Sequence, residues 1–296
     1  MIVGDRVKRT YGGALLALTA VVLTGCGGGA SGEGARKPAP SASSAASAAP
    51  AATGSPLAAA APHAEGWAKW GLTPLPAAPP APADRPIKLA KSGQVPVFSD
   101  VPTKDKVVFI TIDDGAEKDP KFVEMLKDLG VPVSMFLTRD IVKDDYGYFK
   151  KLQDLGNHVH NHTTDHAIMS KVSPEKQHAE ICDAQTALTQ HYGTPPLLFR
   201  PPYGDGANTA ALNTAVQQCG PRAIVLWRES MQIHDMQYQA ADGKLKPGDI
   251  VLAHFRGPKD LKGSTMTEMF AELLRRIQEQ GFAVARLEDY IQAPTG

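Results

Sequence analysis

Four short segments of this 296-residue chain contain side chains of the types that hydrolytic enzymes use in catalysis. The first consists of Asp113, Asp114 and Gly115, and it directly follows the apolar run from Val107 to Ile112. Two adjacent carboxylates can take separate roles, because one can bind a metal ion while the other stays free as a base. A buried strand that ends in such a pair is typical of α/β enzyme sites, although Asp-Gly is also an ordinary turn sequence.

The second segment contains His162 and His166, which are four residues apart. This spacing places both imidazoles on one face of a helix or across one tight turn. With one carboxylate they would form a three-ligand site with open positions, which suits a catalytic divalent metal. A histidine-rich surface turn is the alternative, since His158 and His160 lie just upstream, where we expect them to pack or to support the ligands.

The third and fourth segments supply a rigid turn and a further histidine. Arg200 is followed by Pro201, Pro202 and Tyr203, and the prolines should hold the arginine and the Tyr203 backbone in a fixed geometry. A fixed backbone N–H is what a tetrahedral oxyanion requires. His254 ends an apolar strand-like run and is a candidate general acid. Taken singly, these features also fit a proline-stiffened loop and a half-buried structural histidine.

Strand-like and helix-like segments alternate through the region that contains these residues. The strand-like segments are Val107–Ile112, Val131–Leu137, Asn157–Asn161, Leu197–Arg200, Arg222–Trp227, Asp249–His254 and Phe282–Leu287. Helical spacing and capping residues predict helices over Asp119–Leu129, Asp144–Leu155, Ser173–Tyr192, Ala207–Cys219 and Thr267–Gln280. This alternation indicates an α/β fold with about seven parallel strands. A distorted (β/α) barrel fits better than an open sheet, because every candidate residue falls just after a strand.

In this order and with these gaps, the four segments resemble the signature of the polysaccharide deacetylases, the NodB-homology domain of carbohydrate esterase family 4. The matching stretches are TIDDG at 111–115, HTTDH at 162–166, RPPY at 200–203 and LAH at 252–254. The resemblance implies removal of N-acetyl groups from an N-acetylglucosamine-containing polysaccharide such as peptidoglycan, an exopolysaccharide or chitin-type oligomers. Two alternatives stay open: an O-acetyl esterase acting on acetylated xylan-type glycans, and a glycan-binding lipoprotein with weakened catalysis.

The resemblance also implies which residues perform the reaction. Asp113 matches the general base of the family, and His254 matches its general acid. Asp114, His162 and His166 match the ligands of a divalent metal. That metal is usually Zn²⁺ in the family, with Co²⁺ or another divalent ion as the alternative.

Further matched residues should position the reacting groups and line the substrate pocket. Arg200 matches an arginine that positions the base, and Tyr203 matches the residue whose backbone amide holds the oxyanion. Leu252 matches an apolar wall around the acetyl methyl group, and we expect Pro201 and Trp227 in the same pocket.

The chain departs from the family in the segment that follows Trp227. Serine and isoleucine occupy the positions where the family commonly has acids. Glu229 or Asp235 could replace the usual acidic partner of Arg200, and the sequence leaves open whether either does. This departure concerns the tuning of Asp113 and the substrate preference, and it leaves the metal ligands, the base and the acid in place.

The N-terminal 25 residues have the features of a bacterial lipoprotein signal peptide. A basic region precedes the apolar run from Ala14 to Leu23, which is too short to span a bilayer comfortably. The following Thr24-Gly25-Cys26 completes a stretch that resembles a lipobox, which implies cleavage before Cys26 and a lipid on that residue. We therefore expect a lipoprotein on the outer face of the cell membrane; an ordinary secretory signal, and so a secreted protein, is the alternative.

Residues 26–95 are rich in Ala, Pro and Ser, and we expect a disordered tether there. Trp67 and Trp70 interrupt it, either incidentally or as a contact back onto the domain. Residues 96–293 are long enough for one catalytic domain. Cys182 and Cys219 either pair, as an extracytoplasmic setting allows, or remain buried free thiols.

The charge balance argues against one class of partner. Lys and Arg together number 31, as do Asp and Glu, and no basic block occurs, so we expect no nucleic acid ligand. Nothing in the sequence predicts a protein partner.

Overall fold

The computed structural model describes residues 64–294. The predicted signal peptide, the lipid-bearing Cys26 and the tether up to residue 63 lie outside the described residues, so they stay predictions. Among the residues that are described, no helix combines the length and the apolar character needed to cross a membrane.

A mostly parallel sheet forms the centre of the domain. Its strands are β2 (Val97–Phe98), β3 (Val107–Asp114), β4 (Ser134–Leu137), β5 (His158–Asn161), β6 (Leu198–Phe199), β7 (Ala223–Val225), β8 (Glu229–Met231), β9 (Met236–Tyr238), β10 (Ile250–His254) and β11 (Ala283–Val284). They run in the order β2-β7-β6-β5-β4-β3-β10-β8-β9, with β11 paired to the start of β3. Only the β8–β9 pair is antiparallel in this sheet.

The predicted α/β architecture is confirmed, and the sheet takes the form of a curled half-barrel. The seven expected strands correspond to β3, β4, β5, β6, β7, β10 and β11. In the described part of the chain the sheet has free ends at β2 and β9, so it does not close into a complete barrel. The short β8–β9 hairpin was not predicted, because three-residue strands leave too little alternation to recognise.

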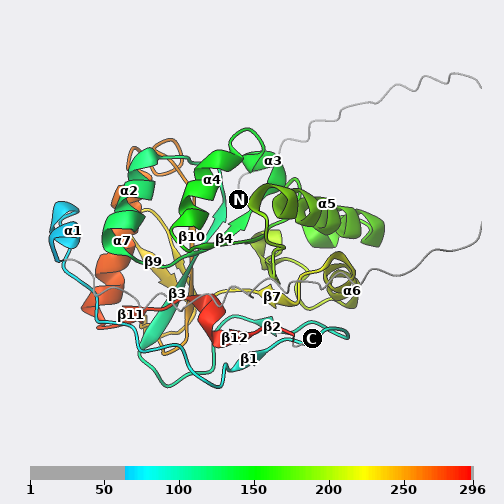
Figure 1. Cartoon of the computed structure of the whole chain (residues 1–296), viewed down its shortest axis with the longest axis horizontal. Coiled ribbons are helices and arrows are strands. Elements are labelled where there is room, and N and C mark those ends of the chain that lie inside the picture. The colour runs from blue at the N-terminus through cyan, green and yellow to red at the C-terminus, as the bar shows by residue number, and fades with distance from the viewer. Residues whose placement is uncertain (1–63, 295–296) are drawn as a thin grey trace, which may run out of the picture. The chain divides into compact units, whose positions relative to one another are not determined.

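Seven helices cover the sheet in the described residues. They are α1 (Ala64–Lys69), α2 (Pro120–Leu129), α3 (Arg139–Val142), α4 (Tyr146–Asp154), α5 (Pro174–Tyr192), α6 (Ala210–Cys219) and α7 (Met266–Glu279). Figure 1 shows α2 beside α7 on one flank of the domain and α5 beside α6 on the other. The caps follow the sequence signals: Ser173 accepts a hydrogen bond at the start of α5, and Thr265 forms a capping box in α7.

The central strand β3 is buried on both faces. Phe109 packs with the interior cluster of the curled sheet, which also contains Phe136 and Ile250. Ile110 and Ile112 point the other way, into the core beneath the helices. A strand enclosed on both sides has little freedom to move, so the residues at its C-terminal end are held at a defined position.

The prediction of a tether up to residue 95 is wrong for residues 64–95. Trp67 in α1 is 2% exposed and joins the core beneath the helices, and the indole N–H of Trp70 donates to Asp128 at 2.9 Å. Further along, β1 (Ile87–Lys88) pairs with β12 (Ile291–Gln292). The Ala/Pro/Ser composition hid these contacts, because a few large apolar anchors are enough to fix a segment that is otherwise polar and small.

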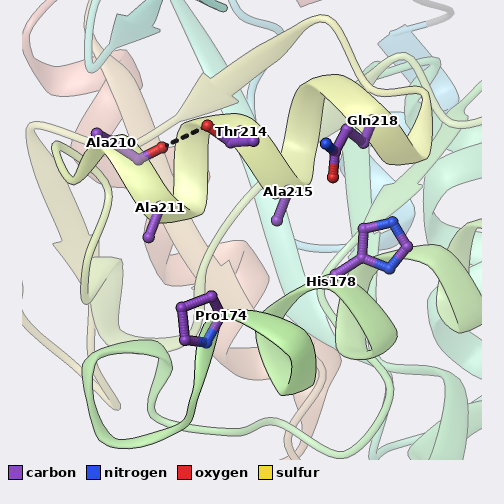
Figure 2. A pocket seen from close by; sticks show the side chains of 7 residues that line it. All are labelled: Pro174, His178, Ala210, Ala211, Thr214, Ala215 and Gln218. Carbon is purple, nitrogen blue, oxygen red and sulfur yellow. Dashed lines mark hydrogen bonds between the residues drawn. The ribbon is translucent and has the colours of Figure 1, made fainter.

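Cys182 and Cys219 form a disulfide that joins α5 to α6. Next to it, the two helices enclose a hollow of about 270 Å³ that Figure 2 shows. Alanine, threonine and glutamine side chains of α6 line it together with Pro174 and His178 of α5. It contains none of the residues that the sequence marks for catalysis, so the chemistry must be sought elsewhere.

Replacing both cysteines with alanine should lower the free energy of unfolding by about 4 kcal/mol. The disulfide closes a loop between residues 37 apart in sequence, and its loss gives the unfolded chain more conformational freedom. Urea denaturation of the parent and of the double variant measures the difference. An unchanged midpoint and slope would contradict this expectation.

Candidate active site

Asp113 and Asp114 lie at the C-terminal end of β3. In the parallel register Asp113 is beside His254 of β10, which brings the predicted base and acid to neighbouring strand ends. Asp114 has a left-handed φ of 74° and Gly115 a φ of 97°, and this turn breaks the strand alternation. Gly115 is required here, because a Cβ at this position would lie 2.3 Å from a methyl group of Val142.

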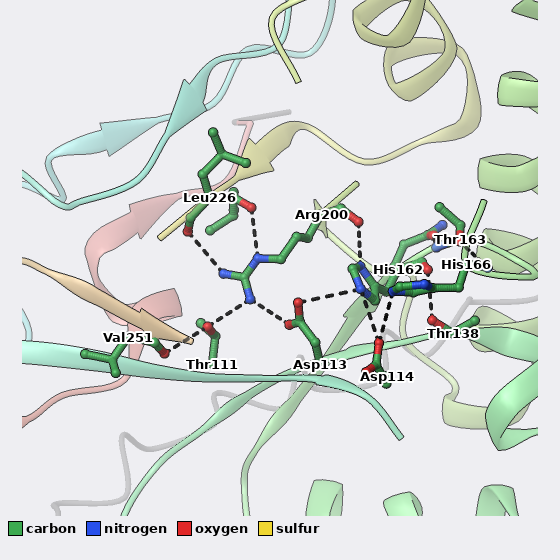
Figure 3. A network of polar contacts seen from close by, with 12 residues as sticks. Thr111, Asp113, Asp114, Thr138, His162, Thr163, His166, Arg200, Leu226 and Val251 are labelled. Atoms are coloured by element: carbon green, nitrogen blue, oxygen red, sulfur yellow. Dashed lines mark hydrogen bonds and ion pairs between the residues drawn. The ribbon is translucent and has the colours of Figure 1, made fainter. Parts of the chain in front are cut away.

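The predicted metal ligands converge beside this strand end (Figure 3). Nε2 of His162 is 3.5 Å from Oδ1 of Asp114, and Nε2 of His166 is 3.2 Å from the same oxygen. The three ligand atoms all lie within 4.8 Å of one another. Oδ1 of Asp114 is buried, and none of the described residues forms a hydrogen bond to it in good geometry.

The donor set fits a divalent cation. Nδ1 of His162 donates to the carbonyl of Arg200 at 2.7 Å, so Nε2 is left with its lone pair available for a metal. Burial acts to raise the pKa of Asp114, but the adjacent imidazoles of His162 and His166 outweigh it and hold the pKa well below its usual range. Burial opposes charge on His162 as well, yet Asp113 and Asp114 raise its pKa. One carboxylate and two imidazoles with this mutual attraction suit a metal such as Zn²⁺.

The two histidines are presented by a tight turn, which is one of the two arrangements that their spacing allowed. Thr163 has a φ of 72° and His166 a φ of 65°. Asn161 holds this turn from the end of β5, because its Oδ1 accepts from the Thr163 N–H at 2.9 Å. Left-handed non-glycine residues cost about 1–3 kcal/mol each and persist where the surroundings over-determine them. Four of the five in the described chain are at this site: Asp114, Thr163, His166 and Tyr203.

Arg200 connects the predicted base to a predicted metal ligand, because its carbonyl accepts from His162 and its side chain bonds Asp113. Its side chain is fully buried, and one guanidinium nitrogen donates to Asp113 Oδ1 at 2.6 Å and to Thr111 Oγ1 at 2.9 Å. The other nitrogens donate to the carbonyls of Val225 and Leu226. The structure thus places Arg200 against Asp113, as its predicted positioning role requires.

The turn after Arg200 is rigid in the way its prolines predict. Pro201 and Pro202 are buried, and Gly204 donates to the Pro201 carbonyl at 2.9 Å. Tyr203 has a φ of 61°, and its side chain is 69% exposed. Its ring makes a T-shaped contact with the ring of His166, with 4.9 Å between centroids, so the Tyr203 side chain lies next to a predicted metal ligand.

His254 and Leu252 share the face of β10 that looks into the curled sheet. Leu252 is in register with Thr111, two residues before Asp113, and is 3% exposed. Burial lowers the pKa of His254 to about 4, and Asp113 and Asp114 oppose this shift. Nδ1 of His254 is buried without a hydrogen-bond partner among residues 64–294. The ring is therefore neutral at neutral pH in the free protein.

Trp227 is partly buried against the interior cluster. Its ring centroid lies 5.6 Å from the guanidinium carbon of Arg200, and that of Phe136 lies at 4.2 Å. Trp227 thus packs around the arginine that holds the base, and its predicted contact with substrate stays a prediction.

Neither Glu229 nor Asp235 replaces the acidic partner of Arg200, which answers the question that the sequence left open. Glu229 is in register with Val251, which belongs to the core beneath the helices, so its side chain points away from the interior face. It lies against Asp249 instead. Asp235 is an exposed residue whose carboxylate is 3.6 Å from Arg276. Arg200 uses Asp113 itself, and three further oxygens, as partners.

Raising the pH should destabilise the protein through Glu229. Burial, together with the charge of Asp249, raises the pKa of Glu229 to about 8. The folded state therefore binds a proton that the unfolded state has released, and this contribution to stability is lost as pH rises through about 8. Glu229→Gln should melt near the parent's temperature at about pH 5 and above it at about pH 9. If Tm changed with pH to the same extent in the parent and in Glu229→Gln, Glu229 would not be the source of the pH dependence.

Sequence reasoning missed the residues that hold the metal-binding turn from behind. Glu180 of α5 is fully buried, and its carboxylate accepts the N–H groups of Thr164 and Asp165. The only signal was the polar character of the buried face of α5, which carries Gln177, Glu180 and Gln185. A glutamate is rarely fully buried unless it is paired. A glutamate at an inward position of a helix therefore indicates that specific partners hold its carboxylate.

Comparisons with known proteins agree with this arrangement. The model of the family described as polysaccharide deacetylase matches residues 100–224. An uncharacterized protein of Streptomyces coelicolor is 39% identical over 223 residues, which cover 74% of this chain and 88% of that protein. A peptidoglycan-N-acetylglucosamine deacetylase of Bacillus cereus is 27% identical over 202 residues, covering 65% of this chain and 92% of that one.

A solved structure shows the same fold. The peptidoglycan N-acetylglucosamine deacetylase Bc1960 aligns with a TM-score of 0.57 at 22% identity, over 68% of this chain and 94% of that one. The sequence match, the fold and the convergence of the four motifs at one edge of the sheet all support the same family assignment. The chain belongs to the polysaccharide deacetylase family.

Proposed function

We propose that the protein is a metal-dependent hydrolase that removes N-acetyl groups from the N-acetylglucosamine units of a polysaccharide. One observation carries the proposal. Asp113 stands outside the three-ligand cluster, with Oδ2 at 3.6 Å from Nε2 of His162, and His254 lies beside it on the next strand. A free carboxylate, a metal-binding triad and a histidine at one strand edge are the groups that amide hydrolysis requires.

Asp114, His162 and His166 would hold the metal, with Zn²⁺ as the first candidate and Co²⁺ or another divalent ion as the alternative. When bound, the metal would polarise the acetyl carbonyl and favour ionisation of the attacking water. Asp113 accepts the proton of that water on Oδ2, because Oδ1 is engaged by Arg200. The backbone N–H of Tyr203, at the rigid turn, is the donor for the developing oxyanion.

His254 is the donor for the departing amine. An amide nitrogen leaves poorly as an anion, so the reaction needs a proton at this point. Because His254 is neutral in the free protein at neutral pH, it must take up a proton after substrate binds. Its position next to Asp113 offers the nearest source, namely the proton that the base has taken from the water.

Peptidoglycan is the substrate that we propose first. The name of the Bacillus cereus relative supports this choice, and that protein matches over 92% of its own length. The sequence adds support through the predicted signal peptide and the lipobox-like stretch at Cys26. We propose that a lipid on Cys26 anchors the protein to the outer face of the membrane, where it would meet acetylated glycans.

Acetate release by the metal-loaded full-length protein tests this function. The panel contains peptidoglycan, N-acetylglucosamine oligomers and acetylated xylan, with His254→Ala as the inactive control. We expect acetate from the first two substrates and none from xylan. Release from xylan alone would instead identify an O-acetyl esterase.

A glycan-binding protein with weakened catalysis is the second candidate. It is favoured by Nδ1 of His254, which has no hydrogen-bond partner among the described residues, and by the β8–β9 hairpin after Trp227, which brings no carboxylate to Arg200. A protein that binds metal and peptidoglycan but releases no acetate from any member of the panel would support this alternative.

A further inference from the structure

Glu180 stands out among the buried charged residues because its contacts lead directly to the metal-binding turn. Its side chain is 0% exposed, in the middle of α5. Oε2 accepts the backbone N–H of Thr164 at 3.0 Å and that of Asp165 at 2.9 Å. The Glu180 carbonyl also accepts the hydroxyl of Thr164 at 3.0 Å. Three hydrogen bonds thus tie one residue of α5 to two of the three residues between the predicted ligands.

This turn cannot hold its shape by local preference. Thr163 and His166 both have left-handed backbones, which non-glycine residues avoid. The amides of Thr164 and Asp165 would be left without partners if the carboxylate were absent. Hydrogen bonds from N–H groups to an ionised carboxylate are stronger than neutral ones, so Glu180 is well suited to hold the strained turn.

The charge of Glu180 is itself balanced. Nζ of Lys176 lies 2.5 Å from Oε1 of Glu180 and 3.4 Å from Oδ2 of Asp165, outside the buried region. A buried carboxylate needs partners for both oxygens, and here a cation meets one oxygen and two amides meet the other. On the polar buried face of α5, Glu180 is thus the residue that bonds directly to the turn.

We propose that Glu180 is a positioning residue for the metal, which sets the relative placement of the imidazoles of His162 and His166. The proposal rests on the metal site of the proposed function. Groups that orient metal ligands commonly change metal affinity by about 10–100-fold when they are replaced. Glu180 touches neither ligand side chain, so it acts through the backbone between them.

The test compares metal affinity of the full-length protein with that of Glu180→Gln, by competition with a chromophoric chelator for Zn²⁺ and by the visible spectrum of bound Co²⁺. Glutamine keeps the size of the side chain but is uncharged, so its carbonyl is a weaker acceptor for two amides. We expect a Kd for Zn²⁺ about 10–100-fold higher and an altered Co²⁺ spectrum. Turnover should recover when Zn²⁺ is raised above the new Kd.

Glu175→Gln is the matched control, because Glu175 is an exposed residue in the first turn of the same helix. It should leave the Zn²⁺ affinity unchanged. If Glu180→Gln does not fold, Glu180→Asp provides the same comparison, since it keeps the charge and is too short to reach both amides.

The outcomes separate this inference from the proposed function. If the parent binds Zn²⁺ and the Glu180 variants bind it equally well, the positioning role is wrong and the proposed function stands. If the parent itself binds neither Zn²⁺ nor Co²⁺, both the positioning role of Glu180 and the proposed metal-dependent function are wrong.

Discussion

Replacing Asp113 with asparagine should lower kcat for acetate release by about 10³-fold, while the protein keeps its fold and its metal. Asparagine has nearly the same size as aspartate but cannot accept a proton from water. Arg200 would lose one charged partner, yet its side chain still has Thr111, Val225 and Leu226 to bond. The variant should therefore lose the chemical step rather than its structure.

Three measurements on the Asp113→Asn variant test whether Asp113 is the general base. Metal content should stay near that of the parent, because Asp113 is outside the triad. The circular dichroism spectrum should be unchanged, and KM should shift far less than kcat. A metal-loaded Asp113→Asn protein that turns over like the parent would show that another group is the base.

Replacing Asp114 with alanine should abolish tight binding of the divalent metal and reduce turnover to background. Asp114 supplies the only carboxylate of the triad, and both imidazoles face its Oδ1. Two neutral histidines alone cannot balance the charge of the cation or complete a three-ligand site. Its backbone carbonyl, which accepts from the Thr138 N–H at 3.0 Å, remains in the variant, so folding should survive.

Asp165→Ala is the matched control for this second expectation. Asp165 lies between the two predicted histidine ligands, but its side chain is 47% exposed and its carboxylate lies 3.4 Å from Nζ of Lys176. Metal analysis of the purified proteins should give a stoichiometry near that of the parent for Asp165→Ala and near zero for Asp114→Ala. Equal metal content in Asp114→Ala and the parent would exclude the triad as the metal site.

Several features of the active site could be predicted from short-range patterns. The apolar run before Asp113 predicted a strand, and β3 covers it and extends through both acids. The capping residues and glycines placed α2, α5 and α7 to within a few residues. These patterns can be recognised in the sequence because strand alternation, helical spacing and helix caps depend on residues only a few positions apart.

Other features depend on residues that are far apart in sequence. Arg200 reaches Asp113 across 87 positions, and Val95 exchanges hydrogen bonds with Asn213 across 118. No local pattern reports such a contact, because it depends on how the strands are ordered in the sheet. For the same reason the acids after Trp227 could not be assigned from spacing: one residue of register decides which face of the sheet a side chain occupies.

The sequence by itself determined which residues are the candidates for the chemistry, because their types and order mark strand ends without reference to the fold. It also determined the α/β class, through the alternation of strand-like and helix-like segments. Only the tertiary structure decided how these residues act together. It placed Arg200 on Asp113, turned Glu229 toward Asp249, fixed residues 64–95 to the domain and set Glu180 behind the metal-binding turn. Each of these depends on packing between distant segments, which is settled only when the whole chain folds.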